Sequence, residues 1–250
     1  MKGLLFSILV LISLCTCAQN ALNVLATNSW TAAYARAAGI KRVEQLAPSN
    51  AVHPSEYELQ INDLEKIKKA DLIIYAGYEV VFTQIQQSLK IDPKKFVKIE
   101  TGYVEAGIDS SLLAIAVIAH TQKETRKSIE RIHELFVKSK SDIEIAGLKN
   151  MPVIVHFFQA DFAKEIGLKP VAVIGPAPLE LHELGKLIKI DAKMVIDNFH
   201  NPIAQPLKEM KKDAVFAGLL NFPGLKNTET IEDVIRYNMR QLLDAENSYR

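Results

Sequence analysis

The chain is poor in cysteine and carries almost no excess of charge. Two of its 250 residues are cysteines, Cys15 and Cys17, and 30 basic against 29 acidic residues leave a formal net charge of +1. This balance argues against a nucleic-acid-binding protein, because such proteins carry a marked positive excess. A hydrophobic content of 48% excludes intrinsic disorder. With 11 glycines and 10 prolines, a fibrous or low-complexity protein is excluded as well.

The N-terminus has the features of an export signal. Lys2 precedes an apolar run at residues 4–14, which is too short to cross a bilayer comfortably. Small residues at 16–18 allow ordinary cleavage before Gln19, whereas residues 14–17 resemble a bacterial lipobox in which Cys17 would carry the lipid. We therefore predict a signal peptide over residues 1–18 and a periplasmic or other extracytoplasmic protein, either soluble or lipid-anchored. The mature chain then holds no cysteine pair, which argues against a thiolate metal site.

Beyond the leader, short apolar runs alternate with amphipathic helices. This alternation is typical of α/β proteins with mainly parallel strands. The predicted strands cover residues 23–26, 71–75, 153–155, 171–174 and 194–196. Two helices, running through Ala37 and Glu165, end at Gly39 and Gly167, which suit C-terminal caps.

The two halves of the chain resemble each other. Aligning Gly39 with Gly167 places a strand, a helix and a Gly-(Ile/Leu)-Lys segment in the same order in both. A second match places residues 63–67 on residues 183–187, each before a buried strand. We therefore predict two Rossmann-like lobes. Because ligands bind beyond the carboxyl ends of parallel strands, two facing lobes create a ligand cleft.

A segment without glycine or proline, residues 109–138, separates the halves. We predict one rigid helix of roughly 45 Å at 1.5 Å per residue, capped by Asp109 or Ser110. Residues 112–119 are apolar on every side, which predicts burial, and His120 is expected in the core or between the lobes. The predicted division is a first lobe over 19–108, a connecting helix over 109–140 and a second lobe over 141–250, in a monomer.

Signatures of catalysis are missing. The sequence contains no Gly-x-Gly-x-x-Gly, P-loop, Gly-x-Ser-x-Gly or cysteine nucleophile. His133-Glu134 and His182-Glu183 lack the second histidine of a zinc-protease helix, because Val137 and Lys186 stand in its place. We therefore predict a protein that is not an enzyme.

Three histidines lie where ligand-binding residues concentrate in α/β proteins. His53 is on a loop before Pro54, His156 directly follows a predicted strand, and His200 lies just past another, with Asp197 between. Histidines at strand ends of two lobes favour a metal site. Each could instead be an ordinary polar residue, with Asp197 capping the next turn and His200 bonding backbone.

Residues 53–77 make a resemblance definite. His53-Pro54-Ser55-Glu56-Tyr57-Glu58, followed by the Lys-Ala-Asp-Leu strand at 69–72, resembles the signature of solute-binding proteins of zinc and manganese ABC importers, the cluster A-I metal receptors. The segment around His156 and residues 236–239 are similar to the same family. The resemblance implies two α/β lobes joined by a long helix, with a metal ion held in the cleft between them.

The resemblance also implies a ligand set, from which this chain departs at two of four positions. His53 matches the first ligand and His156 the third. Glu105 stands where the second ligand, a histidine, is expected. Asn221 or Phe222 falls where the family has an aspartate, so Asp197 or His200 would complete the set. Imidazole and carboxylate ligands suit Zn²⁺, with Mn²⁺ as the alternative.

The function that follows is capture of a divalent metal ion and its delivery to an ABC permease in the inner membrane. A second hypothesis is a divergent receptor of the same fold that binds a metal complex, another solute or a protein partner. A third is a zinc-dependent hydrolase, since two histidines, one glutamate and an open position also form a catalytic set. The sequence identifies no general base for that reaction.

Overall fold

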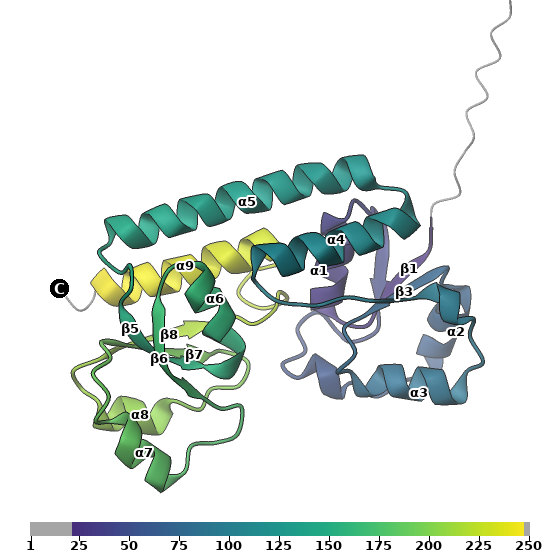
Figure 1. The fold of residues 1–250 in the computed structure, drawn as a ribbon. Helices are drawn as coiled ribbons and strands as arrows, with labels where there is room; N and C mark the ends of the chain where they lie inside the picture. The colour runs from purple at the N-terminus through teal and green to yellow at the C-terminus, as the bar shows by residue number, and fades with distance from the viewer. Residues whose placement is uncertain (1–21, 248–250) are drawn as a thin grey trace, which may run out of the picture.

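The computed structural model describes residues 22–247, apart from the side chains of residues 83 and 86–88. The predicted signal peptide and Cys17 lie outside the described residues. Within 22–247 the strands form two four-stranded parallel sheets, one in each lobe (Figure 1). The first sheet contains β1 (Val24–Ala26), β2 (Val43–Gln45), β3 (Leu72–Tyr75) and β4 (Phe96–Lys98). The second contains β5 (Pro152–His156), β6 (Lys169–Ile174), β7 (Met194–Asn198) and β8 (Val215–Leu219).

The two sheets have the same strand order. The first reads β2-β1-β3-β4 and the second β6-β5-β7-β8, so each lobe places its third strand beside its first. Gly39 and Gly167 end the equivalent helices with φ of +84° and +95°, a conformation in which a side chain would be strained. The predictions of an α/β fold with two similar lobes are confirmed.

Short helices cover the sheets. The first lobe has α1 (Ser29–Ala37), α2 (Ile61–Lys69) and α3 (Val80–Ser88), and the second has α6 (Ala160–Glu165), α7 (Leu181–Leu187) and α8 (Gln205–Met210). Helices α2 and α7 each precede the third strand of their sheet, as the second sequence match predicts. Single 3-10 turns, η1 (Pro54–Glu56), η2 (Pro93–Lys95) and η3 (Phe157–Gln159), shape the loops.

The connection between the lobes is a helical hairpin where the sequence predicts one helix. Helix α4 (Glu105–Ala119) turns back at His120, whose φ of +56° ends it, and α5 (Gln122–Ile145) then crosses above both lobes (Figure 1). The hydroxyls of Thr121 and Thr125 both donate to the carbonyl of Ala38 at the end of α1. The turn is therefore held by the backbone oxygen of Ala38, which is distant in sequence, and no glycine or proline at the turn indicates it in the sequence.

Burial along α4 also differs from the prediction. Leu113, Val117 and Ile118 are exposed over 41%, 60% and 43% of their surface, so only one face of this helix is packed. His120 is exposed at the turn and lies neither in the core nor between the lobes. Asp109 caps nothing; it lies inside α4, where its carboxylate pairs with His133 of α5 at 2.9 Å.

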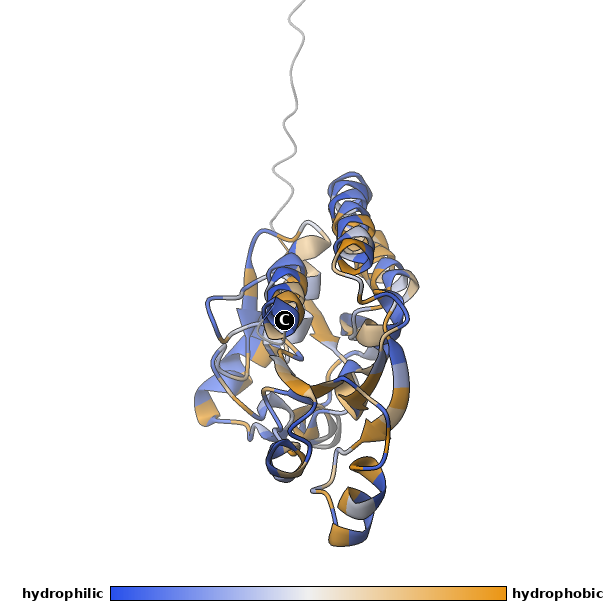
Figure 2. Ribbon diagram, turned by 90° about the vertical axis from the view of Figure 1, so that its left-hand side faces the viewer, coloured by the Kyte–Doolittle hydropathy of each residue, from blue (hydrophilic) through white to orange (hydrophobic). Residues whose placement is uncertain are grey.

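One apolar core runs through both lobes. It includes Ile74 and Val97 of the first sheet, Val155 of the second, and Phe136 of α5. Figure 2 shows hydrophobic strands at the centre of the second lobe, with helices of mixed hydropathy around them. Helix α9 (Ile231–Asn247) packs on β8, α5 and α1, and so belongs to both lobes. Among the described residues, no helix is long and apolar enough to cross a bilayer.

A loop of the second half reaches across to the first lobe just before α9. The hydroxyl of Ser29, at the start of α1, donates to the carbonyl of Pro223 at 2.6 Å. Gly224 follows with φ of +119°, and a Cβ on it would lie 1.7 Å from the carbonyl oxygen of Ser49. The backbone approach at Gly224 is therefore possible only without a side chain, and it sets how closely the two halves meet.

We expect Gly224→Ala to lower the free energy of unfolding by at least about 2 kcal/mol, because it adds both backbone strain and a clash with backbone. Gly185→Ala is the matched control, since Gly185 lies inside α7 and a Cβ there meets no atom within 4 Å. That change should stabilise by up to about 1 kcal/mol. Urea unfolding measures both, and equal effects of the two substitutions would contradict the close approach.

Candidate ligand site between the lobes

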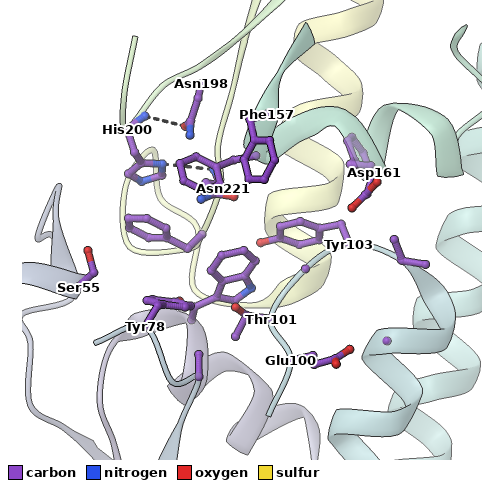
Figure 3. Close-up of a pocket in the computed structure, with 18 of the residues that line it drawn as sticks. Ser55, Tyr78, Glu100, Thr101, Tyr103, Phe157, Asp161, Asn198, His200 and Asn221 are labelled. Atoms are coloured by element: carbon purple, nitrogen blue, oxygen red, sulfur yellow. Dashed lines mark hydrogen bonds between the residues drawn. The ribbon is translucent and has the colours of Figure 1, made fainter. Parts of the chain in front are cut away.

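A cavity of about 950 Å³ lies where the carboxyl ends of the strands of both sheets face each other. The first lobe contributes the His53 loop, Trp30, Tyr78 and residues 98–104. The second contributes Phe157, Phe158 and residues 160–162 after β5, Asn198, His200 and Asn201 at the end of β7, and residues 221–222 after β8. Figure 3 shows His200 and Phe157 on one side of this cavity and Tyr78 and Thr101 on the other. The cleft that the two-lobe prediction implies is present.

The His53 loop is fixed by its neighbours in sequence. His53 lies on the cavity, is exposed, and precedes the η1 turn, which Pro54 opens. Further along, the hydroxyl of Tyr57 donates to the carboxylate of Asp63 at 2.6 Å, and the same carboxylate accepts the backbone N–H of Gln60 at 3.0 Å. Tyr57 of the motif thus attaches the loop to α2. Burial, with this hydrogen bond to Asp63, raises the pKa of Tyr57 to about 12.

A buried glutamate organises the first lobe's side of the cavity. Glu79, 2% exposed, accepts hydrogen bonds from the Thr27 hydroxyl at 2.6 Å, the Asn28 amide at 3.2 Å, and the backbone N–H groups of Ala76 and Gly77. Asn28 in turn caps α1, accepting from the backbone N–H of Trp30 at 3.0 Å. Glu79 therefore positions Trp30 through Asn28. No local pattern marks Glu79, because the two side chains that donate to it, Thr27 and Asn28, lie 52 and 51 residues earlier in the chain.

His200 is held in the opposite wall. Its backbone N–H donates to Asn198, and its ring stacks on Phe222 with 3.7 Å between centroids. The backbone N–H of Asn221 donates to Nδ1 at 3.2 Å, so the neutral ring carries its proton on Nε2. Burial, helped by the nearby His53, lowers the pKa of His200 to about 4, which keeps the ring neutral at neutral pH. Metal-ligating histidines normally donate from their second nitrogen, and Nδ1 here accepts instead.

His156 lies at the end of β5, completely buried and outside the cavity lining. The backbone N–H of Phe158 donates to its Nδ1 at 3.2 Å, so its proton too is on Nε2. A Cβ on Gly175 would lie 3.0 Å from that Nε2, which places the ring against the Gly175 backbone. Burial lowers the pKa of His156, with the nearby Asp197 acting in the opposite direction.

Glu105 and Asp197 are each engaged with other partners. Glu105, at the start of α4, receives the ammonium of Lys140 at 2.6 Å, and Lys140 also pairs with Glu165 at 2.8 Å. Asp197 accepts the backbone N–H groups of Ile203 at 3.2 Å and Ala204 at 2.9 Å. Neither carboxylate is in the cavity lining.

Of the five side chains predicted as ligands, His53 and His200 share the cavity, and the other three do not reach it. Across the part of the chain that the structure describes, no three histidine, cysteine, aspartate or glutamate side chains gather as a metal-binding group. The predicted four-ligand set is therefore not assembled in this structure. The reasons are the lysine that holds Glu105, the backbone groups that hold Asp197, and the burial of His156.

Aromatic side chains form a large part of the lining of the cavity, and no sequence pattern predicted them. Seven rings line it: Trp30, Tyr78, Tyr103, Phe157, Phe158, Phe162 and Phe222. Trp30 is the chain's single tryptophan and stacks on Tyr103 at 5.6 Å between centroids. The one sequence feature that could have indicated this lining is the adjacent pair Phe157-Phe158 directly after β5. Both rings are about half exposed, at 56% and 45%, which is unusual for phenylalanine.

Three hydrogen-bonding groups at the cavity are buried without a partner among the described residues. They are Nε1 of Trp30, the hydroxyl of Tyr103 and Nε2 of His200, on side chains that are 7%, 4% and 3% exposed. An unpaired buried polar group costs free energy. All three atoms are themselves covered in this structure, so a ligand with hydrogen-bond acceptors reaches them only when side chains of the cavity wall shift.

Solved structures of other proteins share this fold. No protein-family model matches the sequence, and no curated protein matches it either. Among solved structures, the periplasmic metal binding protein of Candidatus Liberibacter asiaticus aligns with a TM-score of 0.69 and 16% identity, over 89% of this chain and 98% of that one. The chain has the fold of these binding proteins. The SBP FpvC of P. aeruginosa aligns similarly, in complex with Ni²⁺ (TM-score 0.70, 15% identity, 91% and 97% of the two chains) and with Mn²⁺ (0.68, 16%, 91% and 99%).

This similarity confirms, for the fold, the resemblance seen in residues 53–77. These solved structures align with this chain over 97–98% of their own length, so the similarity extends over the whole fold and is not limited to one lobe. At identities of 15–16% the shared fold does not identify the ligand of this chain, which depends on the side chains of its own cavity.

We expect part of the protein's acid sensitivity to come from His156. Because its folded-state pKa lies below the ordinary 6.5, the unfolded chain binds a proton that the folded protein does not, and stability is lost as the pH falls below about 6.5. One such proton contributes up to about 1.4 kcal/mol per pH unit. Urea unfolding between pH 7.5 and 5 should therefore show a shallower loss in His156→Gln than in the unsubstituted protein.

The exposed His182 of α7 supplies the control for this measurement. His182→Gln should keep the slope of the unsubstituted protein. Equal slopes for His156→Gln and the unsubstituted protein would refute the assignment.

Proposed function

We propose that this chain is an extracytoplasmic receptor that captures a divalent metal ion between its two lobes and delivers it to an ABC permease. The observation that carries the proposal is the placement of His53 and His200, from opposite lobes, on one interlobe cavity. The fold supports it, because the solved proteins that share it are described as metal-binding or were solved with Mn²⁺ or Ni²⁺. The predicted signal peptide and Cys17 support export, with or without a lipid anchor.

His53 is the protein ligand in this proposal. It lies on the cavity surface, exposed, and its side chain caps no helix, so an imidazole nitrogen is free to bind an ion. His200 faces the same cavity with the proton on Nε2 and contacts the ion's other ligands. Imidazole with oxygen donors suits a borderline ion, Zn²⁺ first and Mn²⁺ second. The process is binding and release, with no covalent step.

Metal content tests the proposal. Protein recovered from its native compartment without chelators should carry about one divalent metal ion per chain, measured by mass spectrometry of the elements. His53→Ala should reduce that content at least about tenfold, as expected when a metal ligand or its supporting group is removed. Because His53 is exposed, this substitution should leave the fold intact.

Glu105→Gln is the matched control. It removes a carboxylate that the sequence predicts as a ligand and the structure pairs with Lys140, so metal content should stay at the level of the unsubstituted protein. Protein that carries no metal, or His53→Ala protein that keeps its metal, would overturn the proposal.

A further inference from the structure

The cavity is far larger than a bare ion requires. An ion bound by protein groups at about 2 Å occupies a small, closely lined site. A volume of about 950 Å³ lies instead at the upper end of the range for cavities that hold small organic molecules, which are also lined by aromatic side chains. With one free imidazole and no three-ligand group among the described residues, most coordination positions of an ion here remain for other donors.

The partnerless polar groups of the cavity are suited to acceptors. Trp30 Nε1 can only donate, and His200 Nε2 carries the ring's proton because Nδ1 accepts from Asn221. The Tyr103 hydroxyl can donate as well. A metal cation offers nothing to an N–H or O–H donor, whereas carboxylate or phenolate oxygens would accept from these three once the side chains of the wall shift to uncover them. The charged side chains of the lining balance, with Lys98 and Lys164 against Glu100 and Asp161.

The exposed rings indicate the rest of the ligand. Phe157 and Phe158 project at the end of β5 with about half of their surface uncovered, although phenylalanine is usually buried. Both line the cavity, and Figure 3 shows Phe157 on the second lobe's side of it and Tyr78, half exposed, on the first lobe's side. A flat apolar body between them would cover the rings from both sides.

From these contacts we propose that the metal ion enters the cleft already bound to a small organic chelator with oxygen donors and a flat, aromatic body. This inference rests on the proposed function. His53 fills a coordination position that the chelator leaves open. Trp30, Tyr103 and His200 donate to the chelator's oxygens, and Phe157 and Phe158 pack on its ring.

Calorimetric titration of the mature protein tests the inference with defined probes. The probes are zinc chloride and 1:1 zinc complexes of pyridine-2,6-dicarboxylate, 2,3-dihydroxybenzoate and citrate, each compared with the free chelator. At least one of the two aromatic complexes should bind about tenfold more tightly than zinc chloride or its own free chelator, a difference typical of a few added ligand contacts. Fluorescence of Trp30, the sole tryptophan, should report the same binding.

Two substitutions separate the chelator contacts from the metal contact. Tyr103→Phe removes a hydroxyl without a partner among the described residues, so it should not lower stability, yet it should weaken binding of the complex by about three- to tenfold. Phe157→Ala should weaken the complex similarly and leave the affinity for zinc chloride unchanged. Phe199→Ala is the matched control, because Phe199 is 39% exposed in the same lobe and lies outside the cavity lining.

The outcomes are distinguishable. If zinc chloride binds as tightly as every complex, or if Tyr103→Phe and Phe157→Ala leave the affinity for the complex unchanged, the chelator inference is wrong and metal capture stands. If a free chelator binds as tightly as its complex and His53→Ala changes neither, metal capture fails and the inference fails with it. If only the citrate complex binds, the claim that the chelator has an aromatic body packed on Phe157 is wrong.

Discussion

A line of ring contacts runs from α5 into the cavity and crosses between the lobes. Phe136 contacts Phe162, which contacts Tyr103, which stacks on Trp30, which in turn meets Phe222, with 5.6 to 6.5 Å between successive centroids. Phe162 and Phe222 belong to the second half of the chain, and Tyr103 and Trp30 to the first. Because core side chains are closely packed, no ring can move without its neighbours. The width and lining of the ligand site therefore depend on the shared core.

Backbone geometry decides what the histidines of the second lobe can offer a ligand. His156 and His200 both lie at strand ends, and each accepts a backbone N–H on Nδ1, from Phe158 and Asn221. Each neutral ring thus presents N–H at Nε2, where a metal ligand would need a lone pair. A residue type that suits a metal ion can act as a donor once its second nitrogen is engaged. His53, whose loop leaves its ring at the surface, is free of that constraint.

Local patterns predicted five of the eight strands among the described residues, the helix-ending glycines and the two-lobe repeat, because these depend on neighbours in sequence; β2, β4 and β8 were not predicted. The break at His120 was not predictable in the same way, since the carbonyl that anchors it belongs to Ala38, more than 80 residues earlier. Glu105 likewise stands near a family ligand position, but its partner Lys140 lies 35 residues away. The aromatic lining could be predicted from the sequence only in part, because its rings come from separate segments between residues 30 and 222.

The path of the last segment has a consequence for assembly. Each sheet is built from one continuous stretch of chain, whereas residues 221–247 leave the second sheet, touch the first lobe at Ser29 and Ser49, and end in a helix that packs on α1. Asn221 and Phe222 are also part of the cavity wall. The contacts of this segment come from both lobes. Because it also supplies part of the cavity wall, the ligand site is complete only when this last stretch of the chain is docked against both lobes.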